Sequence, residues 1–437
     1  MEEKRHRLLG FFQRVYITAS SFLSNNLLTH AAAGAYSFLL SALPIILLAV
    51  IILVRIFHTS IEDIKMLVET DNLISNSFNF SAILDSVTSI RSLGIFEIII
   101  GFFIFRMARR FFASLTQSMQ TIYRKRGHGK AIKENLIIIA GEIILIFFIV
   151  IMFIMLIAGN AFLNSALLQN FLSPFMVTLL TNLFRFVPIT LVFLFLFLAY
   201  HFTPRTRPPA AYSLVASACC TITFVIVLII FNSFVNLSRY NLVYGILSNV
   251  IVILFEVYIF FVLFLFFAQF QYVVQFYESF LLAQIYLLPD YSDPNPRRQF
   301  ERIMFIKPNL LYRRYAVRKN KGDIIFHAGE STTEIYYIIQ GTVRLNMTNQ
   351  IIELGTGKTF GEFASLIGGN RTGNAIAETD CVLLRIPGEL FLETIEVDGA
   401  MSRRTLQMVS DFVRKGNVTA NGGIELLADE NAEMPDK

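Results

Sequence analysis

The sequence predicts an α-helical membrane bundle of six transmembrane helices, followed by a soluble C-terminal domain. Hydrophobic residues make up 55% of the 437 residues, with 44 Phe and no Trp, which indicates lipid as the solvent for much of the chain. Residues 1–288 carry 12 acidic and 19 basic side chains, whereas residues 289–437 carry 20 and 18. The first part is therefore sparsely charged and basic, and the second has the charge density of a soluble domain.

Residues 1–30 are expected to form an amphipathic segment on the cytoplasmic side. Basic side chains between Lys4 and Arg14 accompany a mixed apolar stretch, Leu8 to Leu28. This combination is typical of a helix that lies in the interface of a membrane rather than across it.

Six apolar stretches follow, and each approaches the roughly 20 residues that cross a bilayer. They are Ala31–Val54, Ser92–Leu115, Leu136–Ala158, Phe175–Ala199, Ala210–Val235 and Gly245–Phe267. The second stretch is the weakest, because Arg106, Arg109 and Arg110 must turn toward the interface or the bundle interior. Residues 31–288 form the predicted membrane domain.

Lys and Arg in the short loops predict the orientation. With the N-terminus inside, the outer loops carry only Arg55, Lys65, Arg91 and Arg239. The inner side carries eight basic residues from Arg106 to Lys133, then Arg205, Arg207 and a basic run from Arg297 to Lys321. Both termini are therefore expected in the cytoplasm.

Four ionisable residues lie within the predicted spans: Glu97, Glu142, Arg185 and Glu256. Such residues are costly in lipid and often mark functional sites. Counted from the outer ends of their spans, Arg185 and Glu256 both fall near the middle of the membrane, so an ion pair between them is geometrically available. They form either a polar site for a substrate or a buried pair that fixes helix register.

The chain leaves the membrane domain through a segment rich in Pro and Asp. PDYSDPNP (Pro289 to Pro296) breaks regular structure. We therefore assign residues 289–319 to a linker and helical lead-in, residues 320–415 to a soluble domain and residues 416–437 to a disordered acidic tail.

The soluble domain contains a pattern suited to a nucleotide phosphate, FGEFASLIGGNRTGN (Phe360 to Asn374). Gly361 can adopt a turn conformation closed to other residues. Glu362 then begins a short helix, whose first N–H groups have no partner within the helix and can face an anion. Arg371, nine residues later, supplies a planar cation that matches a phosphate.

This pattern resembles the phosphate-binding cassette of cyclic nucleotide-binding domains, and YYIIQGTVRL (Tyr336 to Leu345) resembles their first strands. The resemblance covers about residues 320–415 and implies a β-roll (jelly-roll) that takes cyclic AMP or cyclic GMP as a regulatory ligand. In that family the glutamate holds the ribose 2′-hydroxyl, and the arginine and nearby N–H groups hold the phosphate. The implied site consists of Gly361, Glu362, Phe363, Ala364, Arg371 and Thr372.

Two features of the cassette leave alternatives open. Gly373 and Asn374 stand where the family usually has Ala and a β-branched residue, and a polar, flexible pair there leaves the tightness of the cradle open. The domain could also keep the fold without binding a nucleotide, with Glu362 and Arg371 paired to each other. The hydroxyl of Thr372 favours acceptance of cyclic GMP.

The membrane half resembles the YihY/BrkB family of bacterial inner-membrane proteins, also labelled ribonuclease BN-like. The resemblance covers about residues 10–280 and is carried by HAAAGAYSFLLSALPIILL (His30 to Leu48), YHFTPRTRPPAAYSLVAS (Tyr200 to Ser217) and NLVYGILSNVIVILFEVYIFF (Asn241 to Phe261). It implies six helices in the bacterial inner membrane. The six scattered histidines form no metal-ligand set with carboxylates, so we expect neither a metal site nor an enzyme.

These observations favour a transport or permeability activity regulated by a cyclic nucleotide. The alternative is a membrane scaffold whose C-terminal domain recruits partners or binds no nucleotide. The expected partners are the lipid bilayer and a cyclic nucleotide, with a second copy of the chain as a further candidate; no nucleic acid and no other cofactor is expected.

Overall fold

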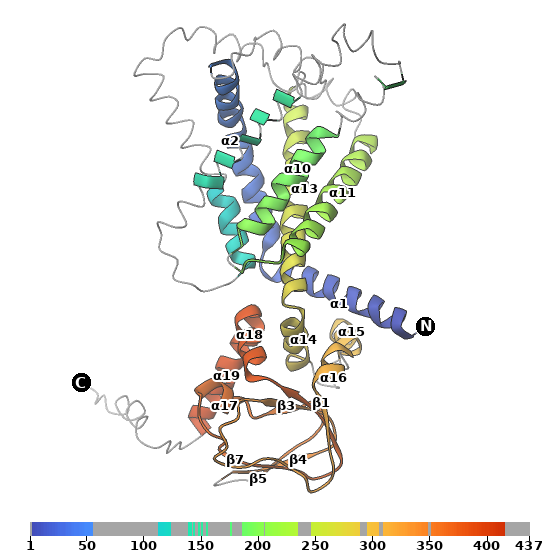
Figure 1. Ribbon diagram of the computed structural model, residues 1–437, viewed down its shortest axis with the longest axis vertical. Coiled ribbons are helices and arrows are strands. Elements are labelled where there is room, and N and C mark those ends of the chain that lie inside the picture. Colours follow the sequence, from blue (N-terminus) through green and yellow to red (C-terminus); the bar gives the residue numbers. More distant parts are fainter. Residues whose placement is uncertain are drawn as a thin grey trace, which may run out of the picture. The chain divides into compact units, whose positions relative to one another are not determined.

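The computed structural model describes residues 2–55, 112–123, 186–204, 206–234, 246–288, 295–305, 309–347 and 351–415, and isolated residues between 139 and 176. The chain divides into two compact units (Figure 1). The helical unit consists of Arg14–Gln275, and the β unit combines Met1–Gln13 with Phe276–Lys437.

Five long helices account for most of the described helical unit. They are α1 (Glu2–Ser24, from Arg14 on), α2 (Leu27–Arg55), α10 (Val187–Phe202), α11 (Ala210–Phe234) and α13 (Ile246–Gln275). Two of these helices begin at or next to a proline, because the fixed φ of proline suits the first helical turn and its missing N–H costs nothing there. Pro188 lies in the first turn of α10, and Pro209 immediately precedes α11.

Small residues allow α2 to pack closely against α13. Ala31 and Ala35 are fully buried, and a Cβ atom added at Gly34 would lie 2.8 Å from the Phe261 ring. The run of small residues at the beginning of the first predicted span is therefore a helix-packing face, as its composition predicts.

Buried polar side chains bond α13 to its neighbours. The Tyr200 hydroxyl donates to the carbonyl of Phe264 over 2.9 Å, and the two rings stack with centroids 5.2 Å apart. The Gln271 amide donates to the Ser213 hydroxyl at 2.8 Å, and its oxygen lies 3.0 Å from the Tyr123 hydroxyl. Helix–helix contact here combines aromatic packing with satisfied polar groups.

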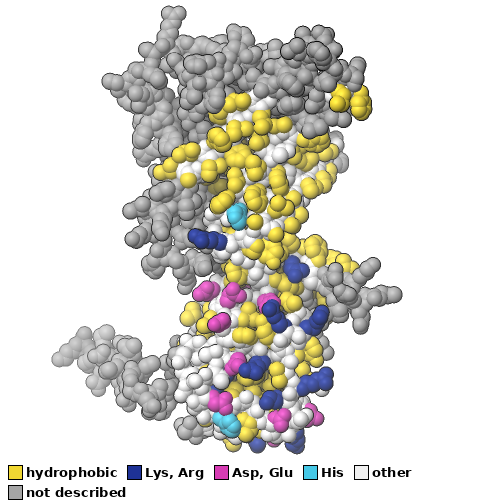
Figure 2. Space-filling view, viewed as in Figure 1, with side chains coloured by type: hydrophobic (Ala, Val, Ile, Leu, Met, Phe, Trp, Pro, Cys, Tyr) yellow, Lys and Arg dark blue, Asp and Glu magenta, His cyan; other side chains and the backbone are white. Residues whose placement is uncertain are grey.

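Two of the helices in the described part are long and apolar enough to cross a membrane, over Ala210–Phe231 and Ile251–Gln275. They correspond to the fifth and sixth predicted spans. Apolar side chains on these helices are exposed, among them Ile222, Ile226, Ile229, Ile251 and Phe255. Figure 2 shows such side chains spread over the helices of this unit, as expected of a lipid-facing surface.

The remaining spans are described in part or not at all. The first lies within α2, and α10 covers the end of the fourth. Most of the second and third spans lies outside the described residues, so a six-helix bundle stays a prediction. The linker 289–294 and the tail 416–437 also lie outside the described residues.

The β unit contains eight strands and six helices within its described residues. The strands are β1 (Ala316–Lys319), β2 (Ile324–Phe326), β3 (Ile335–Gln340), β4 (Val343–Met347), β5 (Ile351–Leu354), β6 (Thr359–Phe360), β7 (Gly373–Ala377) and β8 (Cys381–Ile386). The helices are α14 (Tyr277–Tyr286), α15 (Pro296–Phe305), α16 (Asn309–Tyr315), α17 (Glu362–Ile367), α18 (Gly388–Val397) and α19 (Gly399–Lys415).

The strands form two antiparallel four-stranded sheets, in the orders β1-β8-β3-β6 and β2-β7-β4-β5. Alternate side chains of both sheets meet in one core, which excludes water from the roll. The core consists of Phe326, Tyr336, Ile338, Val343, Leu345, Phe360, Ala375, Ala377, Cys381 and Leu383. The predicted antiparallel β domain is confirmed.

Two segments distant from the strands in sequence complete the β unit. Helix α14 packs against α18, and the Ser279 hydroxyl donates to Glu393 at 2.5 Å. The Tyr277 hydroxyl donates to Gln13 at 2.7 Å, and the Gln13 amide donates to the carbonyl of Met304 at 2.8 Å. The sequence assigned residues 1–30 to a separate segment and 276–288 to the membrane domain, whereas these contacts group 1–13 and 276–288 with the β unit.

Replacement of Gly341 tests the turn that carries the chain from β3 to β4. Its φ is +98°, and an added Cβ would lie 2.6 Å from the carbonyl oxygen of Asp380. We expect Gly341→Ala to destabilise the β unit by at least about 2 kcal/mol, with faster hydrogen exchange of β3 and β4. Gly355→Ala is the matched control, because nothing lies within 4 Å of its added Cβ. Equal exchange in both variants would contradict the assignment of strain to this turn.

Candidate nucleotide-binding site

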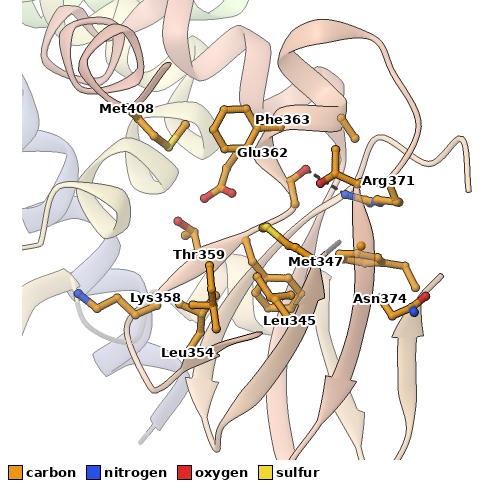
Figure 3. A pocket seen from close by; sticks show the side chains of 17 residues that line it. Leu345, Met347, Leu354, Lys358, Thr359, Glu362, Phe363, Arg371, Asn374 and Met408 are labelled. Carbon is orange, nitrogen blue, oxygen red and sulfur yellow. Dashed lines mark hydrogen bonds between the residues drawn. The ribbon is translucent and has the colours of Figure 1, made fainter. Parts of the chain in front are cut away.

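A cavity of about 310 Å³ opens between strands of the roll and the helix α17. Its polar side chains include Glu362, Arg371 and Lys358, and the six residues that the sequence assigned to the site all line it. The remaining walls are mainly apolar, formed by Phe326, Leu345, Met347, Ile352, Leu354, Phe360 and Met408. A mainly apolar pocket with a few convergent polar groups has the composition of a small-molecule site (Figure 3).

Arg371 connects three segments around this cavity. Its Nε donates to the Thr332 hydroxyl at 2.9 Å, and its two terminal nitrogens donate to the carbonyls of Gly361 (2.9 Å) and Glu334 (2.6 Å). The backbone of Arg371 also exchanges hydrogen bonds with Gly329 and Glu330. These contacts fix the guanidinium and join the loop before β3 to the turn before α17.

The surroundings of Arg371 compensate its buried charge. Its side chain is 1% exposed, lies 4.2 Å above the Phe326 ring and has Glu334 Oε2 at 3.9 Å. Burial lowers the pKa of Arg371, and the nearby Tyr336 and Glu334 oppose that shift. The cation is therefore held in place by the protein itself.

Gly361 and the beginning of α17 form the edge of the cavity nearest Arg371. Gly361 has φ +90°, and an added Cβ would lie 2.6 Å from Nη1 of Arg371. Glycine is thus required for both conformation and space. Phe363 and Ala364 follow in the first turn of α17, where backbone N–H groups have no acceptor within the helix.

Glu362 is directed into the cavity and bonded on one oxygen. The residue is 6% exposed, and its Oε1 accepts a hydrogen bond of 2.9 Å from the Tyr286 hydroxyl of α14. Among the described residues, Glu362 and Arg371 form no ion pair, and the acidic partner of Arg371 is Glu334. The direct pairing of Glu362 with Arg371 is therefore not made here, and whether the domain binds a nucleotide stays a prediction.

Gly373 and Asn374 both contact segments outside the cassette. Gly373 begins β7 beside Met347, and an added Cβ would lie 2.5 Å from the carbonyl oxygen of Asn346. The Asn374 side chain accepts a hydrogen bond of 2.8 Å from the N–H of Ala328. Glycine thus permits close approach of two strands, and asparagine fastens a loop. Thr372, just before them, is exposed and lines the cavity.

Several cavity residues were not anticipated from the sequence. Lys358 follows the turn Gly355–Gly357. Met408 lies on α19, and Tyr286 and Glu334 contact the cassette from outside it. Short motifs contain only residues that are close together in the sequence. The one signal that could have indicated Met408 was the helical periodicity of residues 399–415.

The predicted intramembrane site is described at one position only. Glu256 lies on α13 and is partly exposed. Glu97, Glu142 and Arg185 lie outside the described residues, as do Arg106, Arg109 and Arg110. The Arg185–Glu256 pair therefore stays a prediction. Among the residues that are described, no group of three or more His, Cys, Asp or Glu side chains gathers as a metal site would require.

The surroundings of Glu334 predict a pH-dependent stability of the β unit. A hydrogen bond from Arg385 Nε (3.2 Å) is the main cause that lowers the pKa of Glu334. The stabilisation is fully present above the unfolded-state pKa, about 4.3 for Glu. It is lost as the pH falls through the lower folded-state pKa.

We therefore expect Glu334→Gln to reduce the free energy of unfolding by about 1 kcal/mol at pH 7, and by much less below pH ~4. Urea denaturation of the full chain in detergent, followed by the β-sheet signal in circular dichroism, measures both values. Glu353→Gln, on exposed β5, is the control and should change neither. A loss for Glu334→Gln that is independent of pH would contradict the role of its charge.

Comparisons with known proteins agree with both parts of this structure. The family model for Virulence factor BrkB matches residues 18–280, and the model for the cyclic nucleotide-binding domain matches residues 316–398. No curated protein gives a significant match.

Three similar solved structures each cover about a quarter of this chain. One, titled "A cyclic-GMP-dependent signalling pathway regulates bacterial phytopathogenesis", is 22% identical and covers 25% of this chain and 91% of its own, with a TM-score of 0.22. The half-site-occupied EAL enzyme Bd1971 is 27% identical over 23% of this chain and 96% of its own, with a TM-score of 0.20. The catabolite activator protein of Thermus thermophilus is 23% identical over 28% and 57%, with a TM-score of 0.23.

At these TM-scores the likenesses establish nothing about function. The match of the first family model, in contrast, extends over more than half of the sequence and includes the packed helices α2, α10, α11 and α13. The chain therefore belongs to the Virulence factor BrkB family and carries a cyclic nucleotide-binding domain at residues 316–398.

Proposed function

We propose that this chain is a bacterial inner-membrane protein in which a cyclic nucleotide, bound by the β unit, regulates a transport or permeability activity of the helical unit. The observation that carries the proposal is the cavity lined by both Glu362 and Arg371. It offers a carboxylate for a ribose hydroxyl and a fixed guanidinium for a cyclic phosphate. Apolar strand residues offer a surface for a purine ring.

The arrangement of these groups suits an anionic ligand. Arg371 donates three hydrogen bonds to the protein, and a guanidinium has five N–H donors, so donors are left for a phosphate oxygen. The N–H groups at the beginning of α17 add to the positive potential at the same edge. Lys358 brings a further positive charge to the cavity.

The membrane part of the proposal has six spans with both termini in the cytoplasm. Two long apolar helices and the family membership support a membrane location. The excess of Lys and Arg in alternate loops supports the orientation, which places the β unit where cyclic nucleotides are made.

A second candidate function is a membrane scaffold whose β unit binds no nucleotide. The observation in its favour is the burial of Arg371, whose charge is already compensated by protein oxygens and Glu334. In that case Arg371 would serve the roll alone, and the β unit would act by contact with partners.

Nucleotide titration separates these candidates. We expect full-length protein in nanodiscs to bind cyclic AMP or cyclic GMP with micromolar affinity, measured by calorimetry. Arg371→Ala should weaken binding at least about 100-fold, because a charge-assisted contact to phosphate is lost. Arg385→Ala is the matched control, because Arg385 also forms an ion pair with Glu334 but does not line the cavity. Absence of binding to the wild type would refute the sensor and favour the scaffold.

Reconstitution tests the activity of the helical unit. We expect liposomes that contain the full-length chain to release an entrapped mixture of small ions at a rate that changes at least about threefold when the nucleotide is added on the side of the β unit. Arg371→Ala should abolish that response and leave the basal rate unchanged. Nucleotide binding without any change in flux would contradict the transport proposal.

A further inference from the structure

The contact between Tyr286 and Glu362 links the candidate site to a helix outside the cassette. Tyr286 lies near the end of α14, and 76 positions separate it from Glu362. Helix α14 follows α13 after the single residue Phe276. The residue that faces a ribose hydroxyl is thus bonded to the helix that directly follows a candidate membrane span.

Tyr286 is fixed by three elements of the β unit. Its ring packs on Phe391 of α18 with centroids 5.8 Å apart, and its hydroxyl lies 3.6 Å from the sulfur of Met408 on α19. Burial and the charge of Glu362 raise the pKa of Tyr286, so the hydroxyl keeps its proton. The hydroxyl is therefore a permanent donor, aimed at Oε1 of Glu362.

The carboxylate can serve Tyr286 and a ligand at once. An ionised carboxylate accepts about four hydrogen bonds, two on each oxygen. Tyr286 uses Oε1, and among the described residues no hydrogen bond is formed to Oε2. Tyr286 itself is not part of the cavity wall, whereas Glu362 is. A ligand hydroxyl can therefore reach the carboxylate without displacing the tyrosine.

We infer that Tyr286 is a positioning residue of the nucleotide site, whose hydroxyl holds the Glu362 carboxylate in the orientation that receives the ribose 2′-hydroxyl. This inference rests on the proposed function and adds its regulation: the position of α14 and the affinity for nucleotide depend on each other. Such dependence is reciprocal, so bound nucleotide stabilises α14 in the position seen here.

The 2′-hydroxyl provides a sharp test, because only ligands that carry it use Glu362. Cyclic AMP, cyclic GMP and their 2′-deoxy analogues are titrated into the full-length chain and its Tyr286→Phe variant in nanodiscs. We expect Tyr286→Phe to weaken the tighter-bound ribonucleotide about tenfold and its 2′-deoxy analogue less than twofold. In the Glu362→Gln background, Tyr286→Phe should have no further effect on either ligand, because the carboxylate through which it acts is already gone.

Tyr315→Phe is the matched control. The Tyr315 hydroxyl donates to the carboxylate of Glu278 at 3.1 Å, and Glu278, like Tyr286, belongs to α14. Neither Tyr315 nor Glu278 lines the cavity. The affinities of this variant should equal those of the wild type. Circular dichroism verifies that each variant is folded, and hydrogen exchange of residues 277–286 reports on α14. We expect cyclic nucleotide to slow that exchange in the wild type and to slow it less in Tyr286→Phe.

Three results would overturn the inference. An equal loss for ribo- and deoxyribonucleotides would show that Tyr286 only supports the fold. Unchanged affinity would show that Glu362 needs no positioning, and tighter binding would show that the tyrosine competes with the ribose. In each of these results the wild type binds nucleotide and the proposed function stands. A wild type that binds neither nucleotide refutes the proposed function, and the positioning role with it.

Discussion

The candidate site depends on the burial of one charged side chain, Arg371. A guanidinium removed from water is costly unless its donors are satisfied and its charge is compensated. Here the carbonyl oxygens of Gly361 and Glu334 and the hydroxyl of Thr332 accept hydrogen bonds from three of its five N–H donors, and the Glu334 carboxylate compensates the charge. The same contacts that make burial tolerable also join the loops around the cavity, so Arg371 serves both the site and the roll.

This constraint explains why residues around the cavity are so restricted. Gly361 must be glycine because its φ is positive and because Nη1 of Arg371 occupies the space where a Cβ would stand. Phe326 covers the face of the guanidinium at 4.2 Å and also belongs to the core of the roll. One planar cation thus determines the turn before α17 and the packing of β2.

The sequence could predict the parts of the site that are close together along the chain. Gly361, Glu362 and Arg371 lie within eleven residues, and local geometry is enough to bring them to one cavity. The contacts of Gly373 and Asn374 could not be predicted from the motif, because they are made with β4 and with Ala328 in a distant loop. Tyr286 was not predictable at all: its partner is 76 positions away, and its apolar neighbours on α14 are indistinguishable by composition from membrane residues.

The hydrogen bonds of Gln13 have a consequence for the order in which the protein is made. Gln13 emerges from the ribosome early, but its partners Tyr277 and Met304 follow 264 and 291 residues later. The described apolar helices α2, α10, α11 and α13 are synthesised in between. Domains form largely as their residues become available during translation. The N-terminal residues must therefore wait for the entire helical unit before they can pack. A finished β unit is thus assembled only on a chain whose membrane part has already been translated.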